Sequence, residues 1–120
     1  MAVGADRLAD LVRSLASTDP ASREAACGTV TDWISSFSKY EARLVGMLLV
    51  TLAGAEKAGP TRESELHALY ELADTGGIDG EVVGPIRLLD RGLLGVSELE
   101  YVKYLGEEYL GMSIDTTPSD

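Results

Sequence analysis

The sequence predicts an all-α domain of about six helices in antiparallel pairs. Apolar residues recur at spacings of three and four, which is the helical period, and no stretch alternates as a half-buried strand would. Capping residues and Gly or Pro turns separate these stretches at short intervals. Hydrophobic residues make up 45% of the 120-residue chain, which is enough for a packed core.

The first two helices are expected at residues 6–16 and 20–36. Asp19 or Thr18 can cap the second helix, and Pro20 suits its first turn because the missing N–H would have no partner there. The apolar stripe of the first helix consists of Leu8, Leu11, Val12 and Leu15. That of the second helix consists of Ala26, Val30, Trp33, Ile34 and Phe37.

A third helix is predicted from Ser38 to about Ala53, with Gly54 placed to end it. Between Leu44 and Leu52 this helix is apolar nearly all round. Helices of that kind are buried on most sides. We therefore expect the third helix at the centre of the fold.

Three more helices are predicted in the second half, at residues 61–74, 79–91 and 97–110. The fourth helix is expected to bury Leu66, Leu69, Tyr70 and Ala73. Gly76 and Gly77 follow it, and Asp79 opens the fifth. Pro85 lies inside the fifth pattern and predicts a kink or a late start. Ser97 and Glu100 have the spacing of a capping box for the sixth helix. Residues 1–110 then form one domain, and residues 111–120 are expected to be a flexible tail.

One segment carries a family resemblance. Asp19-Pro-Ala-Ser-Arg-Glu-Ala-Ala26 resembles the D-P-x-V-R-x-x-A turn of HEAT repeats, with Ser22 where the repeat usually has Val. A leucine-rich helix precedes it, as in that family. The resemblance covers about residues 8–37 and implies a HEAT-like short stack. A compact bundle is the alternative, because no second copy of the motif follows.

The charge is strongly negative and unevenly distributed. The formal net charge is −10; residues 1–60 carry 6 basic and 7 acidic side chains, and residues 61–120 carry 4 and 13. Proteins that grip nucleic acid or anionic membranes do so with Lys and Arg, so both partners are disfavoured. A basic protein partner is favoured, because opposite charges on two proteins increase the rate at which they associate.

The remaining composition predicts a cytoplasmic protein. Cys27 is the only cysteine and cannot form an internal disulfide. The start shows no basic segment followed by an apolar run, so no signal peptide is expected. The longest uncharged stretch, Leu44 to Ala55, has 12 residues, against the roughly 20 needed to span a bilayer.

Motifs for catalysis or cofactors are weak, and we expect no enzyme, no cofactor and no metal. Asp74-Thr75-Gly76 matches the aspartic-protease triplet, but it occurs once and ends a helix. Asp79 and Glu81 do not have the spacing of a calcium loop. His67 shares a helix face with Glu63, Glu71 and Asp74. That face is expected to be solvated, with a metal or acid–base site as the alternative.

The sixth helix carries the most informative surface. Tyr101 and Tyr104 fall at the border between its apolar face and solvent, with carboxylates beside them. Tyrosines in such a position suit a protein interface, although they would also serve to cover the edge of a core. The predicted partner-binding residues are Glu98, Glu100, Tyr101, Tyr104, Glu107, Glu108, Asp79 and Glu81.

The chain resembles small HEAT-type immunity proteins of bacterial polymorphic toxin systems. The features that carry this resemblance are its small size, its HEAT-like start, its acidity and its ending, Ser97-Glu-Leu-Glu-Tyr-Val-Lys-Tyr-Leu105. The resemblance implies a cytoplasmic protein that binds a cognate toxin domain and blocks its active site. A nuclease toxin would present a basic cleft to the acidic C-terminal surface. The alternative is a helical adaptor or scaffold without an inhibitory role.

Overall fold

The computed structural model describes residues 2–112, and these residues form six α-helices without a strand. The prediction of an all-α fold is therefore confirmed. The α-helices are α1 (Ala5–Leu15), α2 (Pro20–Asp32), α3 (Lys39–Ala55), α4 (Gly59–Asp74), α5 (Gly80–Val83) and α6 (Val96–Leu110). Three short 3-10 helices are η1 (Ile34–Ser36), η2 (Gly84–Leu88) and η3 (Arg91–Leu93).

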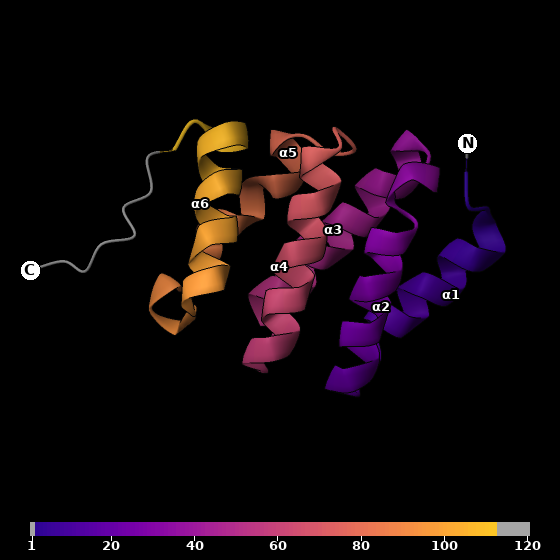
Figure 1. The fold of residues 1–120 in the computed structure, drawn as a ribbon, viewed down its shortest axis with the longest axis horizontal. Coiled ribbons are helices and arrows are strands. Elements are labelled where there is room, and N and C mark those ends of the chain that lie inside the picture. Colours follow the sequence, from indigo (N-terminus) through magenta and orange to yellow (C-terminus); the bar gives the residue numbers. More distant parts are fainter. Residues whose placement is uncertain (1, 113–120) are drawn as a thin grey trace, which may run out of the picture.

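The helices form two layers. Helices α2, α4 and α6 lie side by side in one layer, and α1, α3 and α5 lie behind them (Figure 1). Each helix of the first layer contacts the helix that precedes it in the chain: α1 packs on α2, α3 on α4, and α5 on α6. The chain thus forms three consecutive pairs that are packed next to one another.

The core runs through both layers, and α4 lies at its centre. This helix contacts α2 and α6 within its own layer and α3 behind it. The prediction that the third helix is central is wrong, because α3 leaves Tyr40, Leu44 and Met47 exposed by 87%, 47% and 52%. The apolar side chains that fill the space between the layers include Leu15, Val30, Val45, Leu49, Leu66, Leu69, Leu72, Val83, Val102 and Leu105.

Side-chain caps define the starts of three helices. Asp19 accepts a hydrogen bond from the backbone N–H of Ala21 ahead of α2, and Pro20 occupies the first turn, as expected. Ser38 and Glu41 form a reciprocal capping box at α3. Asp79 caps α5 through the N–H groups of Glu81 and Val82.

Several helix ends differ from those predicted. Helix α2 stops at Asp32 and continues as a 3-10 turn. Gly54 lies inside α3, which ends at Ala55. Pro85 limits α5 to one turn, because it has no N–H to continue the α-helical hydrogen bonds, and the chain goes on as the 3-10 helix η2. The predicted tail at residues 111–120 lies almost entirely outside the described residues.

The start of α6 also differs. The helix begins one residue before Ser97, with Gly95 at the N-cap position. Glu98, instead of Glu100, reaches back to accept a hydrogen bond from the Gly95 N–H at 2.7 Å. The end of α6 is as expected: Gly111 adopts φ 62°, the left-handed conformation that closes helices.

Gly80 sets the distance between α5 and α6. A methyl group at this position would lie 2.5 Å from the carbonyl oxygen of Tyr109. The short helix α5 can therefore contact the end of α6 only because residue 80 has no side chain.

Among residues 2–112, no helix combines the length and apolar character needed to cross a bilayer.

Candidate functional site

A row of aromatic rings lies along the seam between α4 and α6. Tyr70 of α4 lies between Tyr101 and Tyr104 of α6, with ring centroids 5.5 and 4.8 Å away. His67 continues the row one turn earlier on α4, 5.5 Å from Tyr101. Tyr109 extends it at the other end, 6.3 Å from Tyr104. The tilted and edge-on geometries are those that aromatic pairs favour.

Helix periodicity explains why these residues meet. His67, Tyr70 and Asp74 are three and four residues apart on α4, and so lie on one face. Tyr101, Tyr104 and Glu108 have the same spacing on α6. Because α4 and α6 are adjacent in one layer, the two faces form a continuous surface.

Hydrogen bonds fix part of the row. The Tyr104 hydroxyl donates to Asp74 Oδ1 at 3.2 Å. The Tyr109 hydroxyl donates to the carbonyl oxygen of Ala73. Both bonds join α6 to the end of α4, so the tyrosines hold the two helices together as well as lining the surface.

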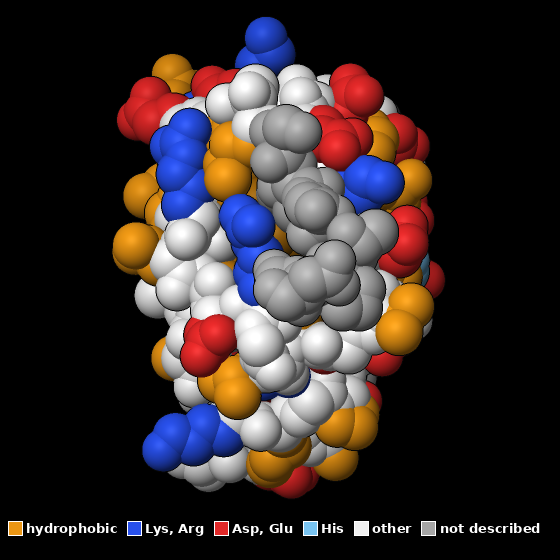
Figure 2. All heavy atoms as spheres, turned by 90° about the vertical axis from the view of Figure 1, so that its left-hand side faces the viewer, with side chains coloured by type: hydrophobic (Ala, Val, Ile, Leu, Met, Phe, Trp, Pro, Cys, Tyr) orange, Lys and Arg blue, Asp and Glu red, His pale blue; other side chains and the backbone are white. Residues whose placement is uncertain are grey.

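Glu63 and Glu71 act on Tyr101, Asp74 binds Tyr104, and further carboxylates follow from helical spacing on α6. We call the whole set the tyrosine–carboxylate face; its members are Glu63, His67, Tyr70, Glu71, Asp74, Glu100, Tyr101, Tyr104, Glu107 and Glu108. Lys103 is the one basic side chain of α6. In a view onto the α6 side, Asp and Glu gather with hydrophobic side chains and the histidine along the right-hand edge (Figure 2). Lys and Arg are seen mainly toward the centre and left.

The electrostatics of the face keep the phenols neutral. Burial raises the pKa of Tyr101, and the charges of Glu63 and Glu71 raise it further. Burial also raises the pKa of Tyr104 to about 12, with additional contributions from Tyr109 and Asp74. Both hydroxyls, which are protonated at neutral pH in any case, therefore remain hydrogen-bond donors at a higher pH than free tyrosine, and the carboxylates near them attract cations.

The structure places three of the predicted partner-binding residues elsewhere. Glu98 is buried, with 5% exposure, and forms an ion pair with Arg62 of α4. Asp79 and Glu81 lie beside Arg43 of α3, at 3.1 and 3.5 Å. The fact that Glu98 is buried follows from its role as the cap of α6, which the sequence pattern assigned to Ser97 and Glu100 instead.

The carboxylates of α4 do not converge on a metal site. His67 Nε2 lies 3.3 Å from Glu71 Oε1, one helical turn away. Among residues 2–112, no group of three or more His, Cys, Asp and Glu side chains is placed to hold a metal ion. Tyr70 is the member of the face that the sequence pattern missed, since its spacing with Leu66 and Leu69 assigned it to the core.

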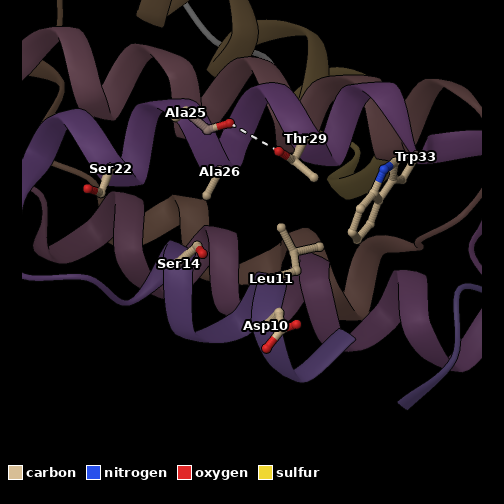
Figure 3. A pocket seen from close by; sticks show the side chains of 8 residues that line it. All are labelled: Asp10, Leu11, Ser14, Ser22, Ala25, Ala26, Thr29 and Trp33. Atoms are coloured by element: carbon tan, nitrogen blue, oxygen red, sulfur yellow. Dashed lines mark hydrogen bonds between the residues drawn. The ribbon is translucent and has the colours of Figure 1, made fainter. Parts of the chain in front are cut away.

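A groove of about 450 Å³ lies between α1 and α2, away from the tyrosine–carboxylate face (Figure 3). Its lining is mostly small: Asp10, Leu11, Ser14, Ser22, Ala25, Ala26, Thr29 and Trp33. The Thr29 hydroxyl donates to the Ala25 carbonyl, and Asp10 pairs with Arg13. The groove thus offers neither a nucleophile–base pair nor an unpaired charge for a ligand.

Comparison with known proteins finds no matching protein family, no matching curated protein and no matching solved structure.

Proposed function

We propose that this chain is a protein-binding module whose tyrosine–carboxylate face engages a basic protein. The observation that carries the proposal is the row formed by His67, Tyr70, Tyr101 and Tyr104. Carboxylates of α4 act on this row: Asp74 binds Tyr104, and the charges of Glu63 and Glu71 act on Tyr101. Tyrosines supply rigid contact area and hydroxyl donors, and they are enriched among residues that dominate binding energy. Carboxylates around them attract and orient Lys and Arg side chains of a partner.

The more specific proposal is an immunity protein that blocks a nuclease toxin. A nuclease binds phosphates in a basic cleft, and carboxylates such as Glu100, Glu107 and Glu108 would take the places of those phosphates. Tyr101 and Tyr104 would be the central anchors. The three consecutive helix pairs in two layers favour the HEAT-like interpretation that this proposal includes.

Charge reversal on the face tests the binding proposal. The partner is isolated from the source cell by pull-down, identified, purified, and its affinity for each variant measured. Glu107→Lys and Tyr101→Ala should weaken binding at least tenfold, whereas Asp6→Lys on α1 should not. Affinity for the native chain should also fall as salt rises, because exposed charges are screened. Equal affinity for all three variants, or no dependence on salt, would contradict the proposal.

Toxicity assays separate the two functional candidates. The chain is co-expressed with a basic nuclease domain encoded by a neighbouring gene. An immunity protein restores growth, and Glu107→Lys abolishes the rescue. Binding through the same face without protection of the cells would instead favour the adaptor or scaffold.

A further inference from the structure

Glu65 is a carboxyl group in the interior of the protein. It lies on α4 with 0% exposure. Neither of its oxygens receives a hydrogen bond from a donor group of the described residues. A carboxylate without hydrogen bonds is very costly to bury, so a neutral acid is the form that this site accommodates.

After burial itself, the charged group that raises the pKa of Glu65 is a second carboxyl, that of Glu56 at the end of α3. Arg23 of α2 binds both Glu56 oxygens, at 2.7 and 2.8 Å, and the Ala58 N–H donates to one of them. The hydrogen bond from Arg23 holds the pKa of Glu56 below its usual range. Glu56 is thus the ionised member of the pair. A hydrogen bond between two carboxyls needs a proton, and Glu65 is the one that must supply it.

The other charged and titratable groups near Glu65 are already engaged. Arg62, on the same helix, donates through Nε to Glu98 of α6 and through Nη1 and Nη2 to the carbonyls of Glu56 and Leu93. Cys27 of α2 is buried, and burial together with Glu65 raises the pKa of its thiol to about 12. The charges of Arg23 and Arg62 favour an ionised Glu65, but neither arginine donates a hydrogen bond to it, and burial outweighs their effect on its pKa.

These contacts join four helices at one end of the molecule. Arg23 links α2 to the end of α3, and Arg62 links α4 to the end of α3 and to α6. A groove of about 290 Å³ reaches the Arg23–Glu56 pair, so solvent has access to this side of the cluster. Glu65 is close enough to both Arg23 and Arg62 for the charges of these arginines to affect its pKa.

We propose that Glu65 is a proton-operated latch. With its proton, Glu65 donates a hydrogen bond to Glu56 and α4 packs closely against α2 and the end of α3. Without it, a fully buried Glu65 carboxylate faces the Glu56 carboxylate, and this end of the fold opens.

The direction of the pH effect follows from the folded and unfolded states. Burial, and then the charge of Glu56, raise the pKa of Glu65 from 4.5 to about 8. A group that binds its proton more tightly when folded stabilises the protein fully below its unfolded pKa, and that contribution is lost as pH rises to the folded pKa. Between about pH 4.5 and 8, the unfolding equilibrium constant should therefore rise by up to about tenfold per pH unit.

The test compares the native chain with Glu65→Gln, which keeps the shape and a hydrogen-bond donor but cannot ionise. Urea unfolding is followed by circular dichroism between about pH 5.5 and 8.5. The native chain should lose stability as pH rises, and Glu65→Gln should lose much less. Glu63→Gln, an exposed carboxyl on the same helix, should behave like the native chain. A flat profile for the native chain, or equal slopes for it and Glu65→Gln, would overturn the proposal.

Two measurements keep the proposal testable if Glu65→Gln does not fold. In the native chain, the side-chain carboxyl carbon of Glu65 is titrated by NMR; a midpoint above about pH 7 supports the latch, and one near the ordinary Glu value overturns it. Alkylation of Cys27 reports the opening. Its rate should rise more steeply with pH than the ionisation of the thiol alone requires, and a rise that matches thiol ionisation would count against opening.

Discussion

At Gly46, the packing between α3 and the region around α5 leaves no room for a methyl group. A Cβ atom there would lie 2.9 Å from Cγ2 of Ile78 and 3.0 Å from Cγ1 of Val82. Both neighbours are buried, and neither is the end of a long flexible side chain. Gly46 is therefore required for packing and not for a turn.

Substitution of two glycines of α3 gives opposite expected results. Gly46→Ala should lower the free energy of unfolding by about 1–3 kcal/mol, because the core must shift to accept the methyl group. Gly54→Ala should raise it by about 0.4–1 kcal/mol, because nothing lies within 4 Å and Ala favours the helix. Urea unfolding measures both. Equal effects of the two changes would contradict the assigned packing.

Arg62 and Glu98 form the most buried ion pair of the described residues, with side chains 11% and 6% exposed. Arg62→Ala should lower the free energy of unfolding by about 3–5 kcal/mol, because it leaves the Glu98 charge buried without its partner. Arg13→Ala is the control, since its pair with Asp10 is more than 70% exposed on both sides. If thermal unfolding shows the same small loss for both variants, the Arg62 pair is not a structural link.

At the scale of the helices, Glu41 ties the start of the chain to α3. Its carboxylate caps α3 at Ser38 and also accepts hydrogen bonds from the N–H groups of Val3 and Gly4. The Ser38 N–H, followed by those of Val3 and Gly4, holds the pKa of Glu41 below its usual value, although burial opposes this. A lowered pKa gives a stabilisation that is present above the unfolded pKa and is lost as pH falls below it.

Glu41→Gln should therefore weaken the protein most above about pH 5 and show a shallower loss of stability between about pH 5 and 3. Glu107→Gln, on the exposed side of α6, should keep the native acid profile. Urea unfolding at a series of pH values separates the two. If the stability of Glu41→Gln falls with acid in parallel with that of the native chain, protonation of Glu41 is not coupled to unfolding.

The helix starts show which elements local sequence can predict. Local sequence patterns are sufficient to predict the starts of α2, α3 and α5, because their capping residues bind neighbours within four positions. These capping residues are Asp19 with Pro20, Ser38 with Glu41, and Asp79.

Gly54 and Ser97 were expected to mark helix boundaries and do not. Pro85 was expected to give a kink or a late start, and α5 instead ends after one turn at Val83. Gly54 is exposed and remains helical, since α3 continues to Ala55, just before Glu56, whose carboxylate binds Arg23. Glu98 takes the place of Glu100 at the start of α6, where Arg62 of a distant helix binds it.

The candidate site was predictable only in part. The helical period placed Tyr101 and Tyr104 at the border of the sixth helix and gathered Glu63, His67, Glu71 and Asp74 on the fourth. That these two faces meet depends on the packing of α4 against α6, which no local pattern encodes. Tyr70, the residue that joins them, was therefore assigned to the core.

At the scale of the whole molecule, the excess of negative charge opposes folding. The formal net charge is −10, and most of it belongs to the second half of the chain. Like charges on one compact body repel, and salt screens that repulsion. The same charges that we propose attract a partner thus reduce the stability of the free protein.

Salt should therefore have opposite effects on stability and on binding. Raising NaCl from about 10 to about 500 mM should increase the thermal midpoint of the free protein and weaken its complex with a basic partner. Differential scanning fluorimetry and calorimetric titration in the same buffers measure the two. A thermal midpoint that falls with salt would show that attractive pairs, such as Arg43 with Asp79, outweigh the repulsion.

Because α4 packs against helices of both halves of the chain, the two halves depend on each other for folding. The loop between α3 and α4 lies where the charge balance of the sequence changes. Yet Glu56 within it binds Arg23 and Arg62, and the helix after it is packed between α2 and α6. If the chain were cut at this loop, each fragment would contain only part of the single core, and neither fragment would fold alone. Mixed together they should reassemble, so this loop is suited to a split-protein complementation pair.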